Sequence, residues 1–201
     1  MKQGFVKVAS ATPRIRVADP VYNAQVICEQ AKEAAEHGAK IVVFPELCIT
    51  GYTCNDLFLQ ELLLEKAKEA LLTIAEETGQ LETLFLVGLP VDKDGRLYNV
   101  AAVLYRGRIL GMIPKKNIPM YAEFYEGRHF TPGEETVTEY RLGKQVIPFG
   151  SNLLFRCEEL PELILGCELC EDLWVAEPPS TSHALMGATA VSYTHLTLPT
   201  N

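Results

Sequence analysis

Short apolar runs that alternate with amphipathic segments constrain the fold of this chain more than any other feature. Residues 41–44 read IVVF, and a wholly apolar run of this length is typical of a strand that is buried on both faces. On either side of it, over residues 21–37 and 59–75, apolar residues recur at helical spacing. Gly38 and Gly79 follow these two segments, at positions where glycine commonly ends a helix. The alternation predicts a layered α/β domain with helices packed on a sheet.

Further strands are expected around these helices. Asp94-Gly95 and Arg106-Gly107 are tight-turn dipeptides that separate apolar runs, and this pattern predicts an antiparallel meander. No clean period of 2 or 3.6 continues through residues 114–135, so that segment is predicted to be an ordered, irregular and functional loop. The expected strands cover residues 5–11, 41–44, 84–89, 100–105, 109–113, 145–155 and 163–167.

Composition excludes several classes of function. The chain has 201 residues, 48% of them hydrophobic, which suits one domain with a sizeable core. Its net charge of -8 argues against nucleic acid or an anionic membrane as the main partner. No run approaches the roughly 18 apolar residues that a membrane span needs, and the N-terminal stretch MKQGFVKVAS is not expected to be a signal peptide. Six sparsely spaced cysteines without a secretion signal indicate reduced thiols, so a cytoplasmic location is expected.

Three residues next to predicted strands share a chemical logic. Glu46 follows the run at 41–44, Lys115 begins the irregular loop, and Cys170 follows the last predicted strand within the stretch LILGCELCEDLW. A thiol with an ordinary pKa near 8.5 needs a base or a cation nearby to act as a nucleophile. A carboxylate can take its proton, and a lysine together with the backbone N–H of Glu171 can stabilise an oxyanion. These residue types together could carry out acyl transfer on an amide or a nitrile.

Each of these residues also has a purely structural explanation. Glu46 could cap a helix, Lys115 beside Lys116 could be a solvated charge pair, and a cysteine at a strand end is often core filling. Cys167 and Cys170 form a C-x-x-C pair, which could be half of a zinc site or a redox dithiol. A structural zinc site needs four ligands, and no second such pair is present. We therefore expect no metal and assign Cys167 to the core.

Three motifs in order resemble the nitrilase, or carbon–nitrogen hydrolase, superfamily. They are FPELCITGY, PKKNIPMYAEFYEGRHFTPGE and LGCELCEDLW, and the resemblance covers residues 1–190. The variants TGYTCNDLF, YAEFYEGRHF and GCELCEDLWVAEPPS are most similar to its glutaminase branch, the N-terminal domain of glutamine-dependent NAD synthetases. The resemblance implies an αββα sandwich, four-layered on self-association, whose C-terminal part is missing from this chain.

The same resemblance implies roles for individual residues. Glu46 matches the general base, Lys115 the oxyanion stabiliser and Cys170 the nucleophile. Glu126 matches a further acidic position that supports the lysine and positions the substrate. The lysine segment, KKNIPMY, departs from the expected pattern, but the spacing to Pro119 aligns Lys115 rather than Lys116 with the catalytic position.

The implied reaction is the hydrolysis of L-glutamine to glutamate and ammonia through a cysteine thioester. Tyr121 and Glu171 match positions that contact glutamine. The amidase domain is expected to need no cofactor, whereas ATP and Mg are expected only in a missing synthetase domain that amidates deamido-NAD. The intact protein is expected to be a homo-oligomer. Two alternatives stay open: a free-standing amidase for ω-amides or carbamoyl amines, and an inactive fragment of the fold.

The end of the chain reads differently from the rest. Residues 183–190, HALMGATA, predict a helix of small residues that runs into a glycine turn. Residues 191–201, VSYTHLTLPTN, show no apolar pattern that continues the fold and are interpreted as a non-native tail resembling adapter read-through; the alternative is a genuine disordered end. Because missing strands would leave a sheet edge and apolar faces uncovered, we expect the 201-residue chain to have low stability and little activity.

Overall fold

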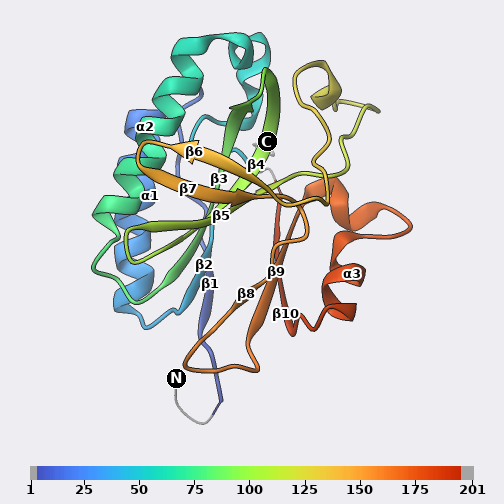
Figure 1. Ribbon diagram of the computed structural model, residues 1–201. Helices are drawn as coiled ribbons and strands as arrows, with labels where there is room; N and C mark the ends of the chain where they lie inside the picture. The colour runs from blue at the N-terminus through green and yellow to red at the C-terminus, as the bar shows by residue number, and fades with distance from the viewer. Residues whose placement is uncertain (1–3, 196–201) are drawn as a thin grey trace.

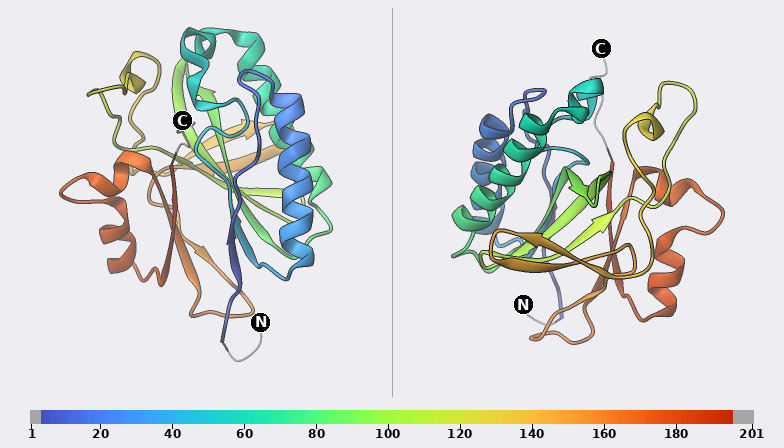
Figure 2. Two further views of the ribbon diagram at one scale, coloured as in Figure 1. Left: turned by 180° about the vertical axis from the view of Figure 1, so that it is seen from behind. Right: turned by 45° about the horizontal axis from the view of Figure 1, so that its top comes forward.

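The computed structural model of this protein describes residues 4–195 and arranges them in four layers (Figures 1 and 2). Helices α1 (Pro20–Glu36) and α2 (Glu61–Glu77) cover one face of a seven-stranded sheet. A three-stranded sheet packs on the opposite face, and helix α3 (Pro179–Leu185) covers that small sheet from outside. The αββα sandwich that the resemblance implies is confirmed, but its four layers lie within a single copy of the chain and do not need the self-association that was expected to form them.

The large sheet combines a parallel half with the predicted meander. Its order is β1-β2-β3-β4-β5-β7-β6, with β1, β2 and β3 parallel and the β3-β4-β5 pairs antiparallel. The small sheet has the order β10-β9-β8, in which β10 and β9 are parallel. The strands are β1 (Val8–Ser10), β2 (Ile41–Val43), β3 (Leu84–Lys93), β4 (Arg96–Tyr105), β5 (Arg108–Pro114), β6 (Thr138–Leu142), β7 (Gln145–Phe149), β8 (Phe155–Arg156), β9 (Ile164–Leu169) and β10 (Ala190–Thr194).

Both faces of the large sheet are buried, which explains the wholly apolar runs in the sequence. Val42 and Phe85 face the helices, whereas Ile41 and Leu86 on the same strands face the small sheet. The small sheet contributes the side chains of Leu165, Cys167 and Leu169 to the layer between the sheets. Each fully buried aliphatic side chain contributes about 1.5–3 kcal/mol to folding, so the two apolar layers fix the order of the sandwich.

The predicted helices and the meander are confirmed, with ends that differ by a few residues. Helix α1 begins where Asp19 accepts a hydrogen bond from the backbone N–H of Tyr22 (3.1 Å) and where Pro20 occupies its first turn. It ends before Gly38, whose φ of 82° lies in the left-handed region. The helix predicted in 183–190 begins earlier, because α3 starts at Pro179.

The strand predicted over residues 145–155 is wrong as a single element. Strand β7 ends at Phe149, and the chain turns at Gly150 to cross from the large sheet to β8 in the small one. A Cβ on Gly150 would lie 3.1 Å from backbone atoms of the segment before β6, so the chain packs closely at this crossing. Strand β6 was not expected, because an edge strand with two buried side chains, Tyr140 and Leu142, has a weak apolar pattern.

The segment after Ala190 also differs from expectation, because residues 190–194 form strand β10 beside β9. Its inward-facing residues are Ser192 and Thr194, so the strand has no apolar alternation that the sequence could reveal. The Thr194 hydroxyl donates to the carbonyl of Phe44 at 2.8 Å. The division at Ala190 and the non-native origin of residues 191–201 stay predictions, and residues 196–201 lie outside the described part.

We predict that Gly88→Ala will destabilise the fold through the segment that carries Glu46. A Cβ at Gly88 would lie 2.3 Å from the backbone N of Leu47 and 2.7 Å from the carbonyl O of Pro45. Backbone cannot yield as a side chain does, so we expect a loss of about 3 kcal/mol in the free energy of unfolding, measured by urea denaturation.

The matched control is Gly111→Ala on β5. Its Cβ would meet only the ends of the Leu153 and Phe155 side chains, at 3.0 and 2.9 Å, and these can rotate away. We expect a loss of about 1 kcal/mol for this variant. Equal losses for the two variants would contradict the close approach of β3 to the segment around Glu46.

Candidate active site

The residues singled out in the sequence meet where strands of the two sheets end. Glu46 follows β2, Lys115 follows β5, and Cys170 begins the 3₁₀ helix η3 (Cys170–Trp174) directly after β9. Glu126 begins the 3₁₀ helix η2 (Glu126–Arg128) in the irregular loop. Because β2 and β5 run in the same direction, their carboxyl ends lie at the same end of the large sheet.

Lys115 is a buried cation held between two buried carboxylates. Its Nζ lies 2.8 Å from Oε1 of Glu46 and 2.6 Å from Oε1 of Glu126, and its side chain is 0% exposed. The interpretation of Lys115 as a solvated charge pair with Lys116 is therefore wrong: Lys116 points elsewhere and pairs with Glu135 near the surface. With both carboxylates ionised, the cluster carries one net negative charge.

Burial and charge shift the pKa values in this cluster in a consistent direction. Burial alone would lower the pKa of Lys115, but the carboxylates of Glu46 and Glu126 outweigh it and raise that pKa above its usual value. Burial raises the pKa of Glu126, the charge of Glu46 raises it further, and Lys115 opposes both. These shifts favour the charged form of Lys115, and Glu126 takes up a proton more readily than an exposed glutamate.

Cys170 occupies a strained turn beside this cluster. Its φ of 45° lies in the left-handed region, which is unusual for a residue with a side chain and is found where strand-to-helix turns present a nucleophile. The residue is half-buried. Burial, then the charge of Glu46, raises the pKa of the thiol to about 12, while the charge of Lys115 opposes this shift. The raised pKa favours the protonated thiol, which lies near the Glu46 carboxylate.

Asp172 connects the cysteine turn to the lysine segment. Its carboxylate accepts the backbone N–H groups of Leu169 (3.1 Å), Lys116 (3.1 Å) and Asn117 (2.7 Å). Burial raises the pKa of Asp172, and the backbone N–H of Asn117 and that of Leu169 oppose this shift. Two segments far apart in the sequence are thereby fixed relative to each other.

Tyr121 and Glu171 lie at the outer side of the site. The Tyr121 hydroxyl donates to Oε2 of Glu171 at 2.7 Å, and this bond raises the pKa of the phenol. The Tyr121 side chain is 55% exposed, and Glu171 directly follows Cys170. The two side chains expected to contact substrate therefore form a polar, solvent-facing pair next to the thiol.

Two further residues join the cluster without having been expected. Asn99 on β4 donates from Nδ2 to Glu46, and Tyr52 in the 3₁₀ helix η1 (Tyr52–Leu59) donates to Oε1 of Glu126 at 2.9 Å. A lone amide inside the apolar stretch of β4 was the available signal for Asn99. Tyr52 follows Gly51 in a polar loop, and nothing in its local pattern distinguishes it.

The C-x-x-C pair is divided between two environments. Cys167 is 1% exposed, packs between the two sheets, and has a pKa raised to about 12 by burial, so its assignment to the core is confirmed. All six cysteines are free thiols. Within residues 4–195, no cluster of three or more His, Cys, Asp or Glu side chains could hold a metal ion. Among the described helices, none is long and apolar enough to cross a membrane.

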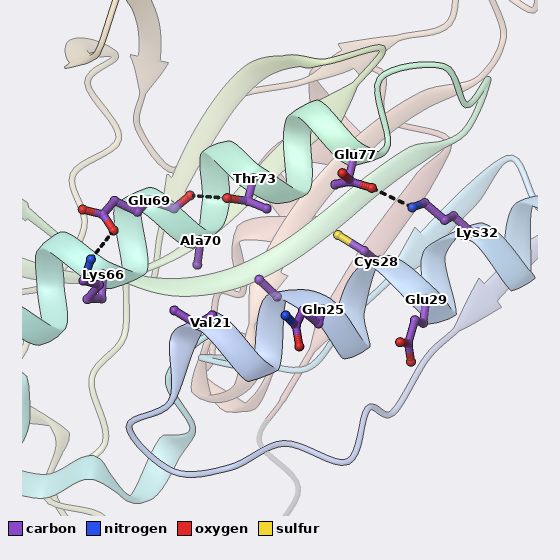
Figure 3. Close-up of a pocket in the computed structure, with 11 residues that line it drawn as sticks. Val21, Gln25, Cys28, Glu29, Lys32, Lys66, Glu69, Ala70, Thr73 and Glu77 are labelled. Carbon is purple, nitrogen blue, oxygen red and sulfur yellow. Dashed lines mark hydrogen bonds and ion pairs between the residues drawn. The ribbon is translucent and has the colours of Figure 1, made fainter.

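Among the grooves on the surface of residues 4–195 are two that Cys170 does not line. One of about 410 Å³ lies between α1 and α2, where Lys32 pairs with Glu77 above the buried Cys28 (Figure 3). The other, of about 250 Å³, reaches Glu126 from the side of η1. It is lined by Tyr52, Thr53, Asn55, Phe58, Glu123, Phe124, Tyr125, Glu126, His129 and Phe130.

The fold and this constellation define a class of hydrolase. The chain belongs to the carbon–nitrogen hydrolase family, which it matches over residues 7–200.

Its relatives include glutamine-dependent NAD(+) synthetases. The synthetase of Mycobacterium bovis is 40% identical over 191 residues, which are 95% of this chain and 28% of that protein. The synthetase of Xylella fastidiosa is 34% identical over 177 residues, 87% of this chain and 29% of that protein. The chain thus spans less than a third of the length of these curated relatives.

Solved structures agree with this assignment. A glutamine-dependent NAD(+) synthetase from Cytophaga hutchinsonii superposes with a TM-score of 0.84 at 28% identity, over 96% of this chain and 30% of that one. An amidase from Nesterenkonia sp. superposes with a TM-score of 0.69 at 22% identity, over 94% of this chain and 64% of that one, and shares the fold.

We predict that Lys115→Met will lower the free energy of unfolding by about 3–5 kcal/mol at pH 8, because it leaves two buried carboxylates without their cation. The folded variant then binds a proton on this carboxylate pair more tightly than the unfolded chain does. Stability therefore rises as the pH falls, and we expect the difference from the unmodified protein to shrink between pH 8 and pH 5. Urea denaturation at several pH values measures it.

Lys116→Met is the matched control, since Lys116 is adjacent in sequence but forms a partly exposed pair with Glu135. It should cost less than about 1 kcal/mol and show little dependence on pH in this range. A loss for Lys115→Met that is small, or that grows as the pH falls, would contradict the buried charge cluster.

Proposed function

We propose that this chain is the amide-hydrolysing part of a glutamine-dependent NAD synthetase and that it converts L-glutamine to glutamate and ammonia. The observation that carries the proposal is the buried Lys115 cation between the Glu46 and Glu126 carboxylates, with the half-buried Cys170 in a strained turn beside them. The names of the relatives support glutamine as the substrate. The ammonia would feed an ATP- and Mg-dependent amidation of deamido-NAD in a further domain.

In the proposed reaction, the Cys170 sulfur attacks the side-chain amide carbon of glutamine while the thiol proton passes to Glu46. Since the thiol pKa is about 12, free thiolate is scarce at neutral pH, and attack and proton transfer have to be coupled. The oxyanion forms beside Lys115 Nζ and the backbone N–H of Glu171. Glu46 then returns the proton to the departing nitrogen, which leaves as ammonia, and a thioester remains on Cys170.

Hydrolysis of the thioester uses the same groups in reverse. A water molecule attacks the thioester carbon and gives a proton to Glu46, the carbon–sulfur bond breaks, and the proton returns to the Cys170 sulfur as glutamate leaves. Every group in this sequence is a side chain or a backbone N–H of the chain. We place the reaction in the cytoplasm, where cysteines such as these stay reduced.

Substrate recognition is proposed to involve the outer polar pair. The Glu171 carboxylate, oriented by its 2.7 Å hydrogen bond from Tyr121, would bind the α-ammonium group of glutamine. Because Glu171 directly follows the nucleophile, this contact would place the side-chain amide of the same molecule near Cys170. An amide without an α-ammonium group would lack this interaction.

We predict that Cys170→Ala in the full-length protein will lower glutamine-dependent ammonia release by more than about 10³-fold. Ammonia is measured with a coupled dehydrogenase assay. Cys157→Ala, at a half-buried cysteine on the small-sheet side, is the control and should retain activity. Undiminished ammonia release from Cys170→Ala would exclude the assignment. If the unmodified protein releases ammonia from ω-amides but not from glutamine, the alternative of a free-standing amidase is favoured.

We also predict that Cys170 will react with iodoacetamide at pH 7 about 10²-fold faster than Cys157, because Glu46 removes the thiol proton during attack. Mass spectrometry of the labelled peptides measures each rate. Glu46→Gln keeps the size of the side chain but removes the base, and it should abolish the advantage of Cys170. If Cys170 in this variant reacts as fast as before, Glu46 is not the base.

A further inference from the structure

Asn99 contacts every charged member of the cluster, although the proposed reaction uses none of its atoms. It lies on β4 and is 0% exposed. Its Nδ2 donates to Oε1 of Glu46 at 2.6 Å and lies 3.4 Å from Oε2 of Glu126. Its backbone carbonyl accepts the N–H of Lys115 at 2.8 Å. One amide residue therefore holds the base, the second carboxylate and the start of the lysine segment.

The other end of the same amide is left without a partner. Within residues 4–195, Oδ1 of Asn99 is buried and has no hydrogen-bond partner. A buried carbonyl without a partner costs stability, and an apolar residue of the same shape would avoid that cost. Turning the amide over would point Oδ1 at two carboxylates, so the charges of Glu46 and Glu126 fix its orientation. The fold tolerates an orphaned acceptor in order to aim a donor at the base.

We propose that Asn99 is a positioning residue that orients the Glu46 carboxylate for the transfer of the Cys170 proton. This inference rests on the proposed function for the role of Glu46 as base. Asn99 is suited to it because a neutral donor stabilises a carboxylate without cancelling the net negative charge of the cluster. Its contact to Glu46 is shorter than that to Glu126, so it distinguishes the two carboxylates.

The pH dependence of this arrangement is set by the groups that surround it. Lys115 contacts both Glu46 and Glu126, and Tyr52 donates to Glu126. The remaining titratable groups interact more weakly through charge. The facing groups are Lys115 after β5, Glu126 on η2, Tyr52 on η1, Cys170 on η3 and Tyr193 on β10.

The test follows alkylation of Cys170 by iodoacetamide as a function of pH in the full-length protein, with Asn99→Leu and Asn99→Asp. Both variants keep the size of the side chain. At low pH the alkylation rate falls as the base becomes protonated, and this part of the rate profile is its acid limb. Losing the donor favours the protonated base, so the midpoint of the acid limb should shift to higher pH by about one unit in Asn99→Leu. Asn99→Asp adds a third acidic group beside two others and should move the limb further.

Thr83→Val is the matched structural control. Like Asn99, Thr83 is buried. It donates to the carbonyl of Ala39 at 2.8 Å and precedes β3 at the opposite end of the sheet from the site. We expect it to lower the thermal unfolding temperature without moving the acid limb. An acid limb that stays in place in both Asn99 variants, or that moves equally in Thr83→Val, would overturn the proposal.

Alkylation needs no glutamine, so the two proposals can fail separately. A shifted acid limb without ammonia release from glutamine would support the positioning role of Asn99 and reject glutamine as the substrate. Ammonia release from glutamine with an unshifted acid limb would reject the positioning role of Asn99 and still support glutamine as the substrate. If the acid limb disappears in Glu46→Gln, the limb reports protonation of Glu46, whichever of the two proposals holds.

Discussion

The site depends on one buried cation, Lys115, shared between the carboxylates of Glu46 and Glu126 at 2.8 and 2.6 Å. Three buried ionisable groups at the end of an apolar sheet are costly unless hydrogen bonds satisfy them. Asn99 and Tyr52 supply donors from two other elements. The cluster is therefore also a constraint on the fold, since β4, β5, η1 and η2 all have to reach the same point.

The proposed nucleophile, Cys170, is subject to a second constraint, because its turn is strained and burial raises the pKa of its thiol. Cys170 has a φ of 45°, and Asp172 holds the turn against the lysine segment by accepting backbone N–H groups from both. With a thiol pKa of about 12, the sulfur is held unreactive until a base takes its proton. Packing of the small sheet on the large one sets the distance between Cys170 and Glu46, so the reactivity of the thiol is a consequence of how the two sheets meet.

Most of the fold could be predicted from local patterns, and the failures have a physical cause. Helical spacing and tight turns were sufficient for α1, α2 and the meander, because each is stabilised by contacts close in sequence. Residues 145–155 contain a switch between sheets at Gly150, which an apolar run does not reveal. Strand β10 is held by pairing with β9, and its inward-facing residues, Ser192 and Thr194, are polar.

For the site, the sequence alone determined the residue types and their places at strand ends, since Glu46, Lys115 and Cys170 each follow an apolar run. The resemblance of the motifs then suggested Glu126. Only the tertiary structure decided that Lys115 is buried between carboxylates, that Cys167 faces the core while Cys170 faces the cluster, and that Asn99 joins the base. The reason is that hydrogen bonds and charge interactions act over a few ångströms in space, between residues as far apart as Glu46 and Lys115, and local sequence patterns do not contain those distances.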